Sequence, residues 1–281
     1  MAENGPRPLL VIDGDNLAHR AWHALPDSIK DGEGRPANCI IGFANMLLSV
    51  WEAEEPRTVF VGFDSVGAPT YRHELLPEYQ AGRDFPPELT FQLDRLPEFV
   101  AALGFPWAKK DGYEADDFIA AATVAEDERG GNALVLTNDR DLFQLATDKT
   151  TILRPRKGVS DIQRVGPPEV KEIYGVDPDQ VPDFVALRGD PSDRIPGVRG
   201  IGPGRASTIL RTHGSLDAAI QDGLFSDETQ KALRMYLRIV RLQYEAPIPE
   251  LPDAQPDWKR AADLVGGWGL KALEKRLRER A

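Results

Sequence analysis

Three acidic residues crowd into residues 112–117, which read GYEADD and include Glu114, Asp116 and Asp117. The stretch that follows, FIAAATVAEDERGG, predicts a helix that ends at glycine, so these acids lie in its first turn. Helix capping explains one or two of them, because the amino end of a helix favours anions. Three acids gathered in a small volume repel one another unless a cation holds them. Capping and a metal site are both open interpretations of this stretch alone.

Other acids follow short apolar runs that predict buried strands. Asp13 follows PLLVI, Asp64 follows TVFVGF, and Asp139 comes soon after ALVLT. Helical patterns such as residues 38–55 alternate with these runs, so the predicted class is α/β, with a mainly parallel central sheet flanked by helices. Strands of such a sheet end at one edge, where ligands bind. A single Asp there is usually a turn residue, but three in register indicate a site.

The candidate metal ligands are all carboxylates near expected strand ends or helix starts: Asp13, Asp64, Glu114, Asp116, Asp117, Asp139, Asp141, Asp190 and Asp193. The four histidines are scattered, and none has zinc-type spacing. Oxygen ligands alone select hard cations, so Mg²⁺ or Mn²⁺ is expected. These acids exceed the needs of one ion, and two ions about 4 Å apart can clamp both reacting oxygens of a phosphodiester.

A glycine-rich turn lies between two helical patterns in residues 195–214, IPGVRGIGPGRASTILRTHG. This helix–hairpin–helix pattern exposes backbone N–H groups, which grip a phosphate backbone without reading its sequence. Arg199 and Arg205 add positive charge, and the glycines are Gly197, Gly200, Gly202 and Gly204. The string RGIGPG also fits a loose dinucleotide fingerprint, but no strand precedes it, so that interpretation is rejected.

Residues 71–90 mix basic, aromatic and proline residues without a clear period. They predict a partly mobile segment over the sheet edge, leading into a helix near 88–103. Its side chains suit phosphate contact and base stacking, although a solvated loop is the plainer interpretation. The remaining patterns predict a β-hairpin around Lys157 and Gly158, a short helix at 167–175, and helical segments at 226–243 and 257–279.

The composition of the 281 residues, 41% hydrophobic and 28% charged, is that of a globular protein. No apolar run approaches the roughly 20 residues that span a bilayer, and no secretory signal is evident. Cys39 is the only cysteine, so no internal disulfide forms and a reducing cytoplasm is expected. The net charge of −11 argues against a nucleic-acid partner unless many acids serve a metal cluster.

Together the motifs resemble the 5′-nuclease superfamily: flap endonucleases and the 5′→3′ exonuclease domains of bacterial DNA polymerase I. The matching strings are VIDG, VGFD, YRHELLPEYQAGR, GYEADD, LTNDRDLFQL, LRGDPSD and IPGVRGIGPGRA, in the family's order over about residues 8–215. The resemblance implies a PIN-like 5′-nuclease fold. Residues 1–178 would form the nuclease domain, with an arch at about 71–110. Residues 179–281 would form a helical duplex-binding region with its H3TH hairpin at 197–204.

The resemblance also implies roles for individual residues. Asp13, Asp64, Glu114, Asp116 and Asp117 would serve a first metal site; Asp139, Asp141, Asp190 and Asp193 would serve a second, with Asp116 a candidate for sharing. Tyr79 would stack against the substrate, and Arg83 would clamp the scissile phosphate. Further DNA contacts would come from Arg72, Gln80, Gly197, Arg199, Gly200, Gly202, Gly204 and Arg205. A K⁺ ion at the hairpin is a further implied ion.

Three positions depart from the family's pattern. Gln80 stands where a Lys is usual beside the stacking Tyr, so a cation is missing there. Arg194 follows Asp193 where relatives often have Asn, with no clear effect. Asp15 lies two residues after Asp13, at a position that relatives fill with residues other than ligands, so we leave Asp15 outside the ligand set.

The resulting hypothesis is a structure-selective, metal-dependent 5′-nuclease of DNA replication and repair. It would hydrolyse DNA at 5′ flaps or at 5′ single-stranded ends next to duplex, and would act as a 5′→3′ exonuclease. RNA-primed DNA is a further candidate partner. The protein is expected to be a monomer in a bacterial-type cytoplasm, associated with the nucleoid and with no membrane partner.

Two alternatives stay open. One is a haloacid-dehalogenase-type phosphatase, with Asp13 as nucleophile and Asp15 as acid/base. It leaves GYEADD, Asp141 and the glycine-rich hairpin unexplained. The other is a non-catalytic binder of branched DNA, for which Gln80 is the sole support.

Overall fold

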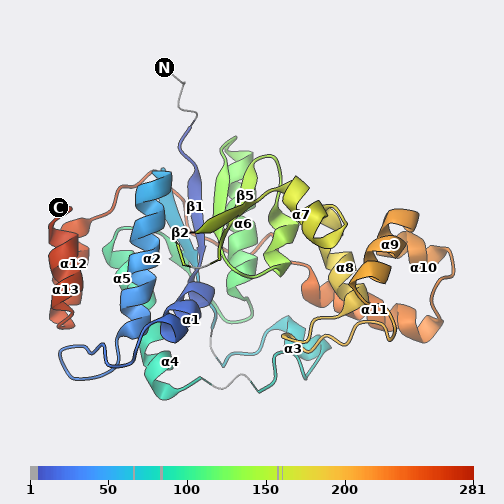
Figure 1. Ribbon diagram of the computed structural model, residues 1–281, viewed down its shortest axis with the longest axis horizontal. Helices are drawn as coiled ribbons and strands as arrows, with labels where there is room; N and C mark the ends of the chain where they lie inside the picture. Colours follow the sequence, from blue (N-terminus) through green and yellow to red (C-terminus); the bar gives the residue numbers. More distant parts are fainter. Residues whose placement is uncertain (1–5, 66, 83–84, 157, 160) are drawn as a thin grey trace.

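The structure of the chain, a computed structural model, describes residues 6–65, 67–82, 85–156, 158–159 and 161–281. Its centre is a six-stranded sheet in the order β3-β2-β1-β4-β5-β6 (Figure 1). All neighbours are parallel except β6, which is antiparallel to β5. The strands are β1 (Leu9–Asp13), β2 (Thr58–Gly62), β3 (Trp107–Ala108), β4 (Ala133–Leu136), β5 (Thr150–Pro155) and β6 (Ile162–Val165). The predicted mainly parallel α/β sheet is confirmed.

The central strands β1, β2 and β4 are mostly apolar and buried along their whole length, because helices cover both faces of the sheet. Along β1, Leu9 and Val11 point into one core, whereas Leu10 and Ile12 point into the other. The first core contains helix α6 (Ala115–Glu128), the 3₁₀ turn η1 (Asp141–Leu145) and helices α7 (Pro167–Tyr174) and α8 (Val181–Arg188). It continues into α9 (Pro203–His213), α10 (Leu216–Gln221) and α11 (Asp227–Val240); a short 3₁₀ turn, η2 (Pro178–Gln180), precedes α8.

The second core lies under a different set of helices. They are α1 (Gly14–Ala24), α2 (Asn38–Glu54), α4 (Pro87–Leu93), α5 (Leu96–Ala102), α12 (Trp258–Gly267) and α13 (Lys271–Arg278). Helices α8 to α11 extend beyond the β5–β6 side, whereas α12 and α13 lie beside α5 at the opposite end of the molecule (Figure 1). The division at residues 178 and 179 stays a prediction, but the helices beyond it occupy two separate places.

Several elements differ from the sequence patterns. The helix expected near 88–103 is two helices, α4 and α5, since Pro97 fits the first turn of a helix but not its interior. The segment expected at 257–279 is likewise α12 and α13, separated where Gly269 adopts a left-handed φ of +76°. The segment without a clear period contains a short helix, α3 (Tyr71–Leu75). None of the helices in the described ranges is long and apolar enough to cross a membrane.

The hairpin predicted around Lys157 and Gly158 is confirmed by the antiparallel pairing of β5 with β6, although Lys157 lies outside the described residues. The strand register then fixes the predicted edge. Asp13 is level with Gly62 of β2, and Ile12 is level with Leu136 of β4. The residues that follow these three strands therefore share one edge of the sheet, the lower one in Figure 1.

Candidate active site

Asp13 is the last residue of β1 and caps α1. Its carboxylate accepts a hydrogen bond from the backbone N–H of Asn16 (3.1 Å) and another from the hydroxyl of Thr137 (2.7 Å), just beyond β4. These two bonds hold the buried carboxylate at the edge shared by β1 and β4.

Asp64 joins the end of β2 to the start of α6. Its carboxylate accepts a hydrogen bond from the backbone N–H of Ala115 (2.7 Å), and its own N–H donates to the carboxylate of Asp15 (2.7 Å). Gly62 permits this close approach, because a Cβ there would lie 2.8 Å from the carbonyl oxygen of Ala115. Asp15 therefore lies buried beside Asp64, as a support for the loop after β2.

The GYEADD stretch begins α6, as predicted. Glu114 is the residue before the helix, and Asp116 and Asp117 lie in its first turn. The Glu114 carboxylate accepts hydrogen bonds from the hydroxyls of Tyr79 (3.1 Å) and Thr70 (3.2 Å). Glu114 is thus held between the start of α6 and the segment around α3.

The two acids after β4 are ordered by the turn that contains them. The N–H of Asp139 donates to the Thr137 hydroxyl (2.9 Å), and the Asp139 carboxylate accepts from the N–H of Asp141 (2.8 Å). Thr137 therefore contacts both Asp13 and Asp139, which ties the ends of β1 and β4 together.

A cavity of about 410 Å³ opens among these elements, and seven acids line it: Asp13, Asp15, Asp64, Glu114, Asp116, Asp139 and Asp193. An adjoining small void is lined in part by Asp116, Asp141 and Asp193. Asp190 lines neither space; its carboxylate accepts from the N–H of Ser192 (2.7 Å) and lies 3.4 Å from the guanidinium of Arg188. The structure thus brings together most of the predicted ligands and leaves Asp190 at the margin.

The crowded acids retain protons more strongly than ordinary carboxyl groups. Burial, with the nearby charges of Asp139 and Asp64, raises the pKa of Asp13 to about 7. Burial, with the charge of Asp64, also raises the pKa of Glu114 to about 7, although Arg72 opposes the rise. Burial and neighbouring acids hold the pKa values of Asp15, Asp116 and Asp141 well above the usual range. The cavity therefore concentrates negative charge that lacks a sufficient counter-charge.

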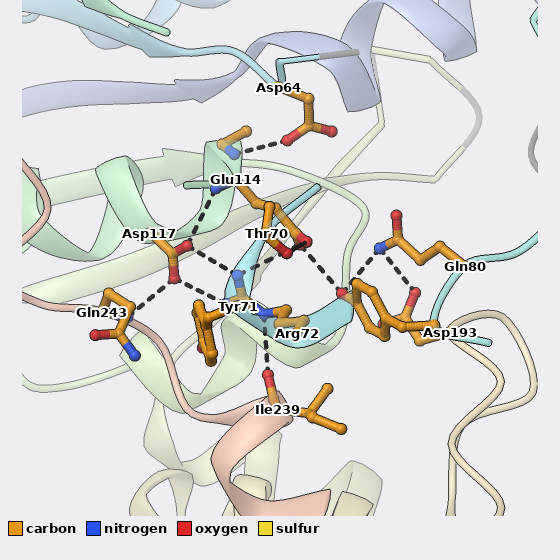
Figure 2. A network of polar contacts seen from close by, with 12 residues as sticks. Asp64, Thr70, Tyr71, Arg72, Gln80, Glu114, Asp117, Asp193, Ile239 and Gln243 are labelled. Carbon is orange, nitrogen blue, oxygen red and sulfur yellow. Dashed lines mark hydrogen bonds and ion pairs between the residues drawn. The ribbon is translucent and has the colours of Figure 1, made fainter. Parts of the chain in front are cut away.

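Asp117 and Arg72 have other roles in the structure than those expected of them. Both are buried, and their side chains form a two-pronged ion pair with both N···O distances at 2.8 Å (Figure 2). Arg72 and two backbone N–H groups, those of Glu114 and Gln243, occupy the acceptor positions of Asp117, and Arg72 is itself shielded from solvent. Neither the metal ligation expected of Asp117 nor the phosphate contact expected of Arg72 therefore fits this structure.

Tyr79 and Gln80 lie on the cavity wall opposite α6. The Tyr79 ring is 4% exposed and packs edge-on against His73, so its predicted stacking on a base stays a prediction. The Gln80 amide donates to the Tyr79 hydroxyl (2.9 Å) and to the carboxylate of Asp193 (3.1 Å) (Figure 2). Its predicted DNA contact is likewise untested. Arg83, the expected phosphate clamp, lies outside the described residues.

The glycine-rich turn joins α8 to α9, so two helices flank it as predicted. Gly202 precedes the first turn of α9 and Gly204 lies within that turn, both exposed. Arg199 and Arg205 are exposed beside them, and Gly197 and Gly200 take left-handed φ values of +65° and +82°. The N–H groups of an exposed helix start are thus presented to solvent, as phosphate binding requires.

Sequence patterns missed two features of the site. One is Thr137, whose hydroxyl fixes two acids. The other is a group that we call the arginine flank: Arg20, Arg140, Arg154 and Arg156. Arg20 donates to the carbonyl of Arg156 (3.1 Å), and burial, together with the smaller effects of Arg140 and Arg156, lowers the pKa of Arg154. None of the four forms an ion pair with another residue that the structure describes.

Comparisons with known proteins agree with this geometry. A family model for the 5′-3′ exonuclease N-terminal, resolvase-like domain matches residues 8–175, and one for the 5′-3′ exonuclease C-terminal SAM fold matches residues 176–249. The chain belongs to the 5′-3′ exonuclease family. Its relatives include DNA polymerase I of Mycobacterium tuberculosis, 38% identical over 92% of this chain and 30% of that protein. DNA polymerase I of Thermus thermophilus is 35% identical over 96% of this chain and 32% of its own length.

The chain thus spans about a third of the length of these curated relatives. Among solved structures, the D15 protein of bacteriophage T5, crystallised with metal ions, matches with a TM-score of 0.69 at 22% identity, over 97% of this chain and 99% of its own. The catalytic core of Rad2 in complex with a DNA substrate matches with a TM-score of 0.60 at 15% identity, over 98% and 92% of the two chains. These likenesses show the same 5′-nuclease fold.

Proposed function

We propose that this chain is a metal-dependent, structure-selective 5′-nuclease that cleaves DNA at 5′ flaps and acts as a 5′→3′ exonuclease. The observation that carries the proposal is the acid-lined cavity at the carboxyl edge of the sheet, to which the ends of β1, β2 and β4 and the start of α6 all contribute. A structural relative, the T5 D15 flap endonuclease, was crystallised with DNA and metal ions, which supports the same class of substrate here.

The donor set fits hard divalent cations. Burial and mutual repulsion raise the pKa values of the cavity's carboxyl groups. A divalent cation bound by their oxygens would offset this repulsion. In the described part of the chain no three His, Cys, Asp or Glu side chains stand ready to hold an ion.

We assign the two sets of ligands as follows. Asp13, Asp64, Glu114 and Asp116 would hold one ion; Asp139, Asp141, Asp190 and Asp193 would hold the other, with Mg²⁺ or Mn²⁺ in both. When bound, such ions supply Lewis-acid stabilisation of the charge that develops on a phosphodiester. Among the acids at the start of α6, this set omits Asp117, whose oxygens are occupied by Arg72 and backbone N–H groups.

The chain's own residues would then position the DNA. The arginine flank comes from α1 and from the ends of β4 and β5, and it offers a phosphate backbone cations that form no ion pair with a described residue. The exposed N–H groups before and within the first turn of α9, with Arg199 and Arg205, would hold the duplex strand. This arrangement weakens the objection raised by the net charge of −11, because many of the acids gather in the cavity while the arginines of the flank lie outside its lining.

Product mapping on a 5′-flap duplex tests the proposal. Substrates labelled at the 5′ or the 3′ end of the flap strand are incubated with Mg²⁺, with Mn²⁺ or with a chelator. We expect cuts near the single-strand/duplex junction with either metal and none with the chelator. Release of terminal phosphate alone would instead indicate a phosphatase, and tight binding without any cut would indicate a non-catalytic binder.

The variant Asp15→Asn separates the first two outcomes. Asp15 supports the backbone of Asp64 in the structure, so we expect a nuclease to lose less than about tenfold in rate, whereas a phosphatase that uses Asp15 as acid/base would be nearly inactive. We also propose a cytoplasmic, nucleoid-associated location, a monomeric state, K⁺ at the hairpin and RNA-primed DNA as a second substrate. Gel filtration and an RNA-primed flap substrate test the state and the second substrate.

A further inference from the structure

Glu114 is held in the cavity by three side chains from one short segment, residues 70–79. The hydroxyls of Thr70 and Tyr79 donate to its two carboxylate oxygens, and the guanidinium of Arg72 lies 3.6 Å from one of them. All three belong to the stretch that contains α3, which Figure 2 shows lying across the start of α6. The position of Glu114 therefore depends on where this segment is placed.

Arg72 is the residue that fixes the segment. Its two terminal nitrogens donate to the two oxygens of Asp117, and its Nε donates to the backbone carbonyl of Ile239 (3.0 Å), near the end of α11 (Figure 2). Arg72 as a whole is 2% exposed, so all these bonds form away from water. One guanidinium thus joins α3, the start of α6 and the end of α11.

Asp117 completes the junction. Each of its oxygens accepts one bond from Arg72; one oxygen also accepts from the N–H of Gln243 (2.9 Å) and the other from the N–H of Glu114 (3.1 Å). A carboxylate has about four acceptor positions, and these four donors occupy them. Asp117 therefore holds the backbone of Glu114 directly, while Arg72 approaches its side chain.

We propose that Arg72 and Asp117 are positioning residues, whose ion pair places Glu114 in the metal pocket by locking α3 and the end of α11 onto the start of α6. The proposal rests on the proposed function for its link to catalysis. It also couples the helical region that would hold duplex DNA to the pocket, because α11 packs against α8, one of the two helices that flank the glycine-rich turn. The pocket is complete only while that junction is closed.

The chain offers a matched control in a second buried ion pair. Arg57 and Glu126 join the start of β2 to the last turns of α6, at the edge of the sheet opposite the cavity, and both are buried, as Arg72 and Asp117 are. Arg→Lys at either position keeps the charge but loses the two-pronged geometry. The two variants therefore carry a similar cost in folding and differ in their distance from the pocket.

The experiment compares Arg72→Lys, Asp117→Asn, their double variant and Arg57→Lys with the wild type. Mn²⁺ binding without DNA is measured by calorimetry, cleavage of a 5′-flap duplex by steady-state kinetics, and folding by thermal melting. We expect each of the first two variants to weaken Mn²⁺ binding about tenfold and to lower kcat about 10- to 100-fold, with KM for DNA within about threefold. The double variant should be no worse than the poorer single one, because the residues act as a unit. Arg57→Lys should lower the melting temperature and leave Mn²⁺ binding and kcat within about threefold of wild type.

Three results would overturn the proposal. A raised KM with unchanged kcat in Arg72→Lys would make it a DNA contact. Loss of one bound Mn²⁺ in Asp117→Asn but not in Arg72→Lys would make Asp117 a ligand. If Arg57→Lys lost as much Mn²⁺ affinity and kcat as Arg72→Lys, both ion pairs would act only by stabilising the fold. If Arg72→Lys does not fold, Thr70→Val tests whether residues 70–79 position Glu114, because it removes only the Thr70 hydroxyl that donates to the Glu114 carboxylate. Unchanged Mn²⁺ binding in Thr70→Val would count against the proposal. A wild type that binds Mn²⁺ but cuts no DNA refutes the proposed function, while the Mn²⁺ comparison still tests the ion pair.

Discussion

The two ends of α6 carry buried acids in opposite circumstances. Near its last turn, Glu126 is 2% exposed and meets Arg57, whose Nε lies 3.1 Å from both carboxylate oxygens. Arg57 also donates to the carbonyl of Leu251 (2.7 Å), so it fastens the segment before α12 to the sheet. At this end of the helix the buried acid has a cation, and that cation has further partners.

The first turn of α6 contains one buried acid that is paired with an arginine and one acid that is not. Asp117 has its cation in Arg72, just as Glu126 has Arg57. Asp116, next to it, faces the other acids of the cavity, and burial with the charges of Asp139, Asp13 and Asp64 raises its pKa well above the usual range. Burial alone therefore does not mark a functional acid on this helix. The mark is burial without a counter-charge, which an external cation must supply.

The largest expected effect comes from neutralising one acid at each end. Asp116→Asn should lower the rate of flap cleavage at least about 1,000-fold, because it removes a ligand from the proposed pocket, while melting temperature stays constant or rises as repulsion is relieved. Glu126→Gln should do the reverse: it leaves the buried Arg57 with only the exposed Asp253 as an ionic partner, which lowers stability, while cleavage by the folded fraction stays near wild type. Quenched-flow cleavage and thermal melting measure both.

Asp139→Asn extends this test to the other side of the cavity. It should also abolish cleavage while leaving binding of duplex DNA measurable by fluorescence anisotropy. A near wild-type rate in Asp139→Asn would show that the ligand assignment is wrong, whatever the result at Asp116.

The uncompensated acids should also make the metal-free protein less stable as pH rises. The folded pKa of Asp13 is about 7, above the ordinary value of 3.8, so the folded state binds more protons than the unfolded state between these values. The contribution of Asp13 to stability is then greatest at low pH within this window and is lost as pH rises toward 7, by about 2 kcal/mol between pH 5 and pH 7. Urea unfolding in chelator across this range measures it.

Two controls test whether the pH dependence of stability arises from the acids of the cavity. Millimolar Mg²⁺ should flatten the dependence, since a bound cation replaces the protons. Asp13→Asn should remove part of the slope in chelator, whereas Glu126→Gln should leave the slope unchanged. A metal-free protein whose stability rises from pH 5 to pH 7 would contradict the charge state proposed for the pocket.

The acidic side of the site was largely predictable from sequence, because parallel strands end at one edge by rule. Asp13, Asp64 and Asp139 follow apolar runs, and the register of β1 with β2 and β4 places the ends of these strands at the same edge of the sheet. The roles of Asp117 and Arg72 were not predictable. Residues 72 and 117 are brought together only when α3 docks, and α3 lies in a segment whose residue pattern has no helical period.

The arginine flank escaped prediction for a related reason. Its members come from α1, from the turn after β4 and from β5 and the residue beyond it, so no local run of basic residues reveals them. Only the β1-β4-β5 order makes them neighbours. The net charge of −11 concealed them further, because this total sums an acid-rich cavity and a basic flank into a single negative number.

A smaller effect is expected at the duplex-binding turn. Arg205→Ala should weaken binding of duplex DNA about 3- to 10-fold and reduce the slope of log K against log[salt] by about 1, because one exposed cation no longer displaces a counter-ion. Arg278→Ala is the control: Arg278 is also exposed but is paired with Asp263 and Glu274, each at 2.8 Å, so its removal should leave the slope unchanged. Equal slopes in Arg205→Ala and wild type would count against the turn as a DNA contact.

The smallest effect is expected at Gln80, on the wall of the cavity opposite α6. Its amide joins Tyr79 to Asp193, so it spans the space between the two proposed ion sites without supplying charge. Gln80→Lys should raise the single-turnover rate at saturating Mg²⁺ by about 3- to 10-fold, because a cation here would face the charge that develops on the phosphate. Gln80→Met, of similar length and without charge, should not exceed the wild type. A slower Gln80→Lys enzyme would instead mean that the neutral bridge to Asp193 keeps that acid available for its ion, and that an added ammonium competes with the metal. Cleavage would then require that the wall of the cavity at Gln80, like the first turn of α6, carry no positive charge of its own.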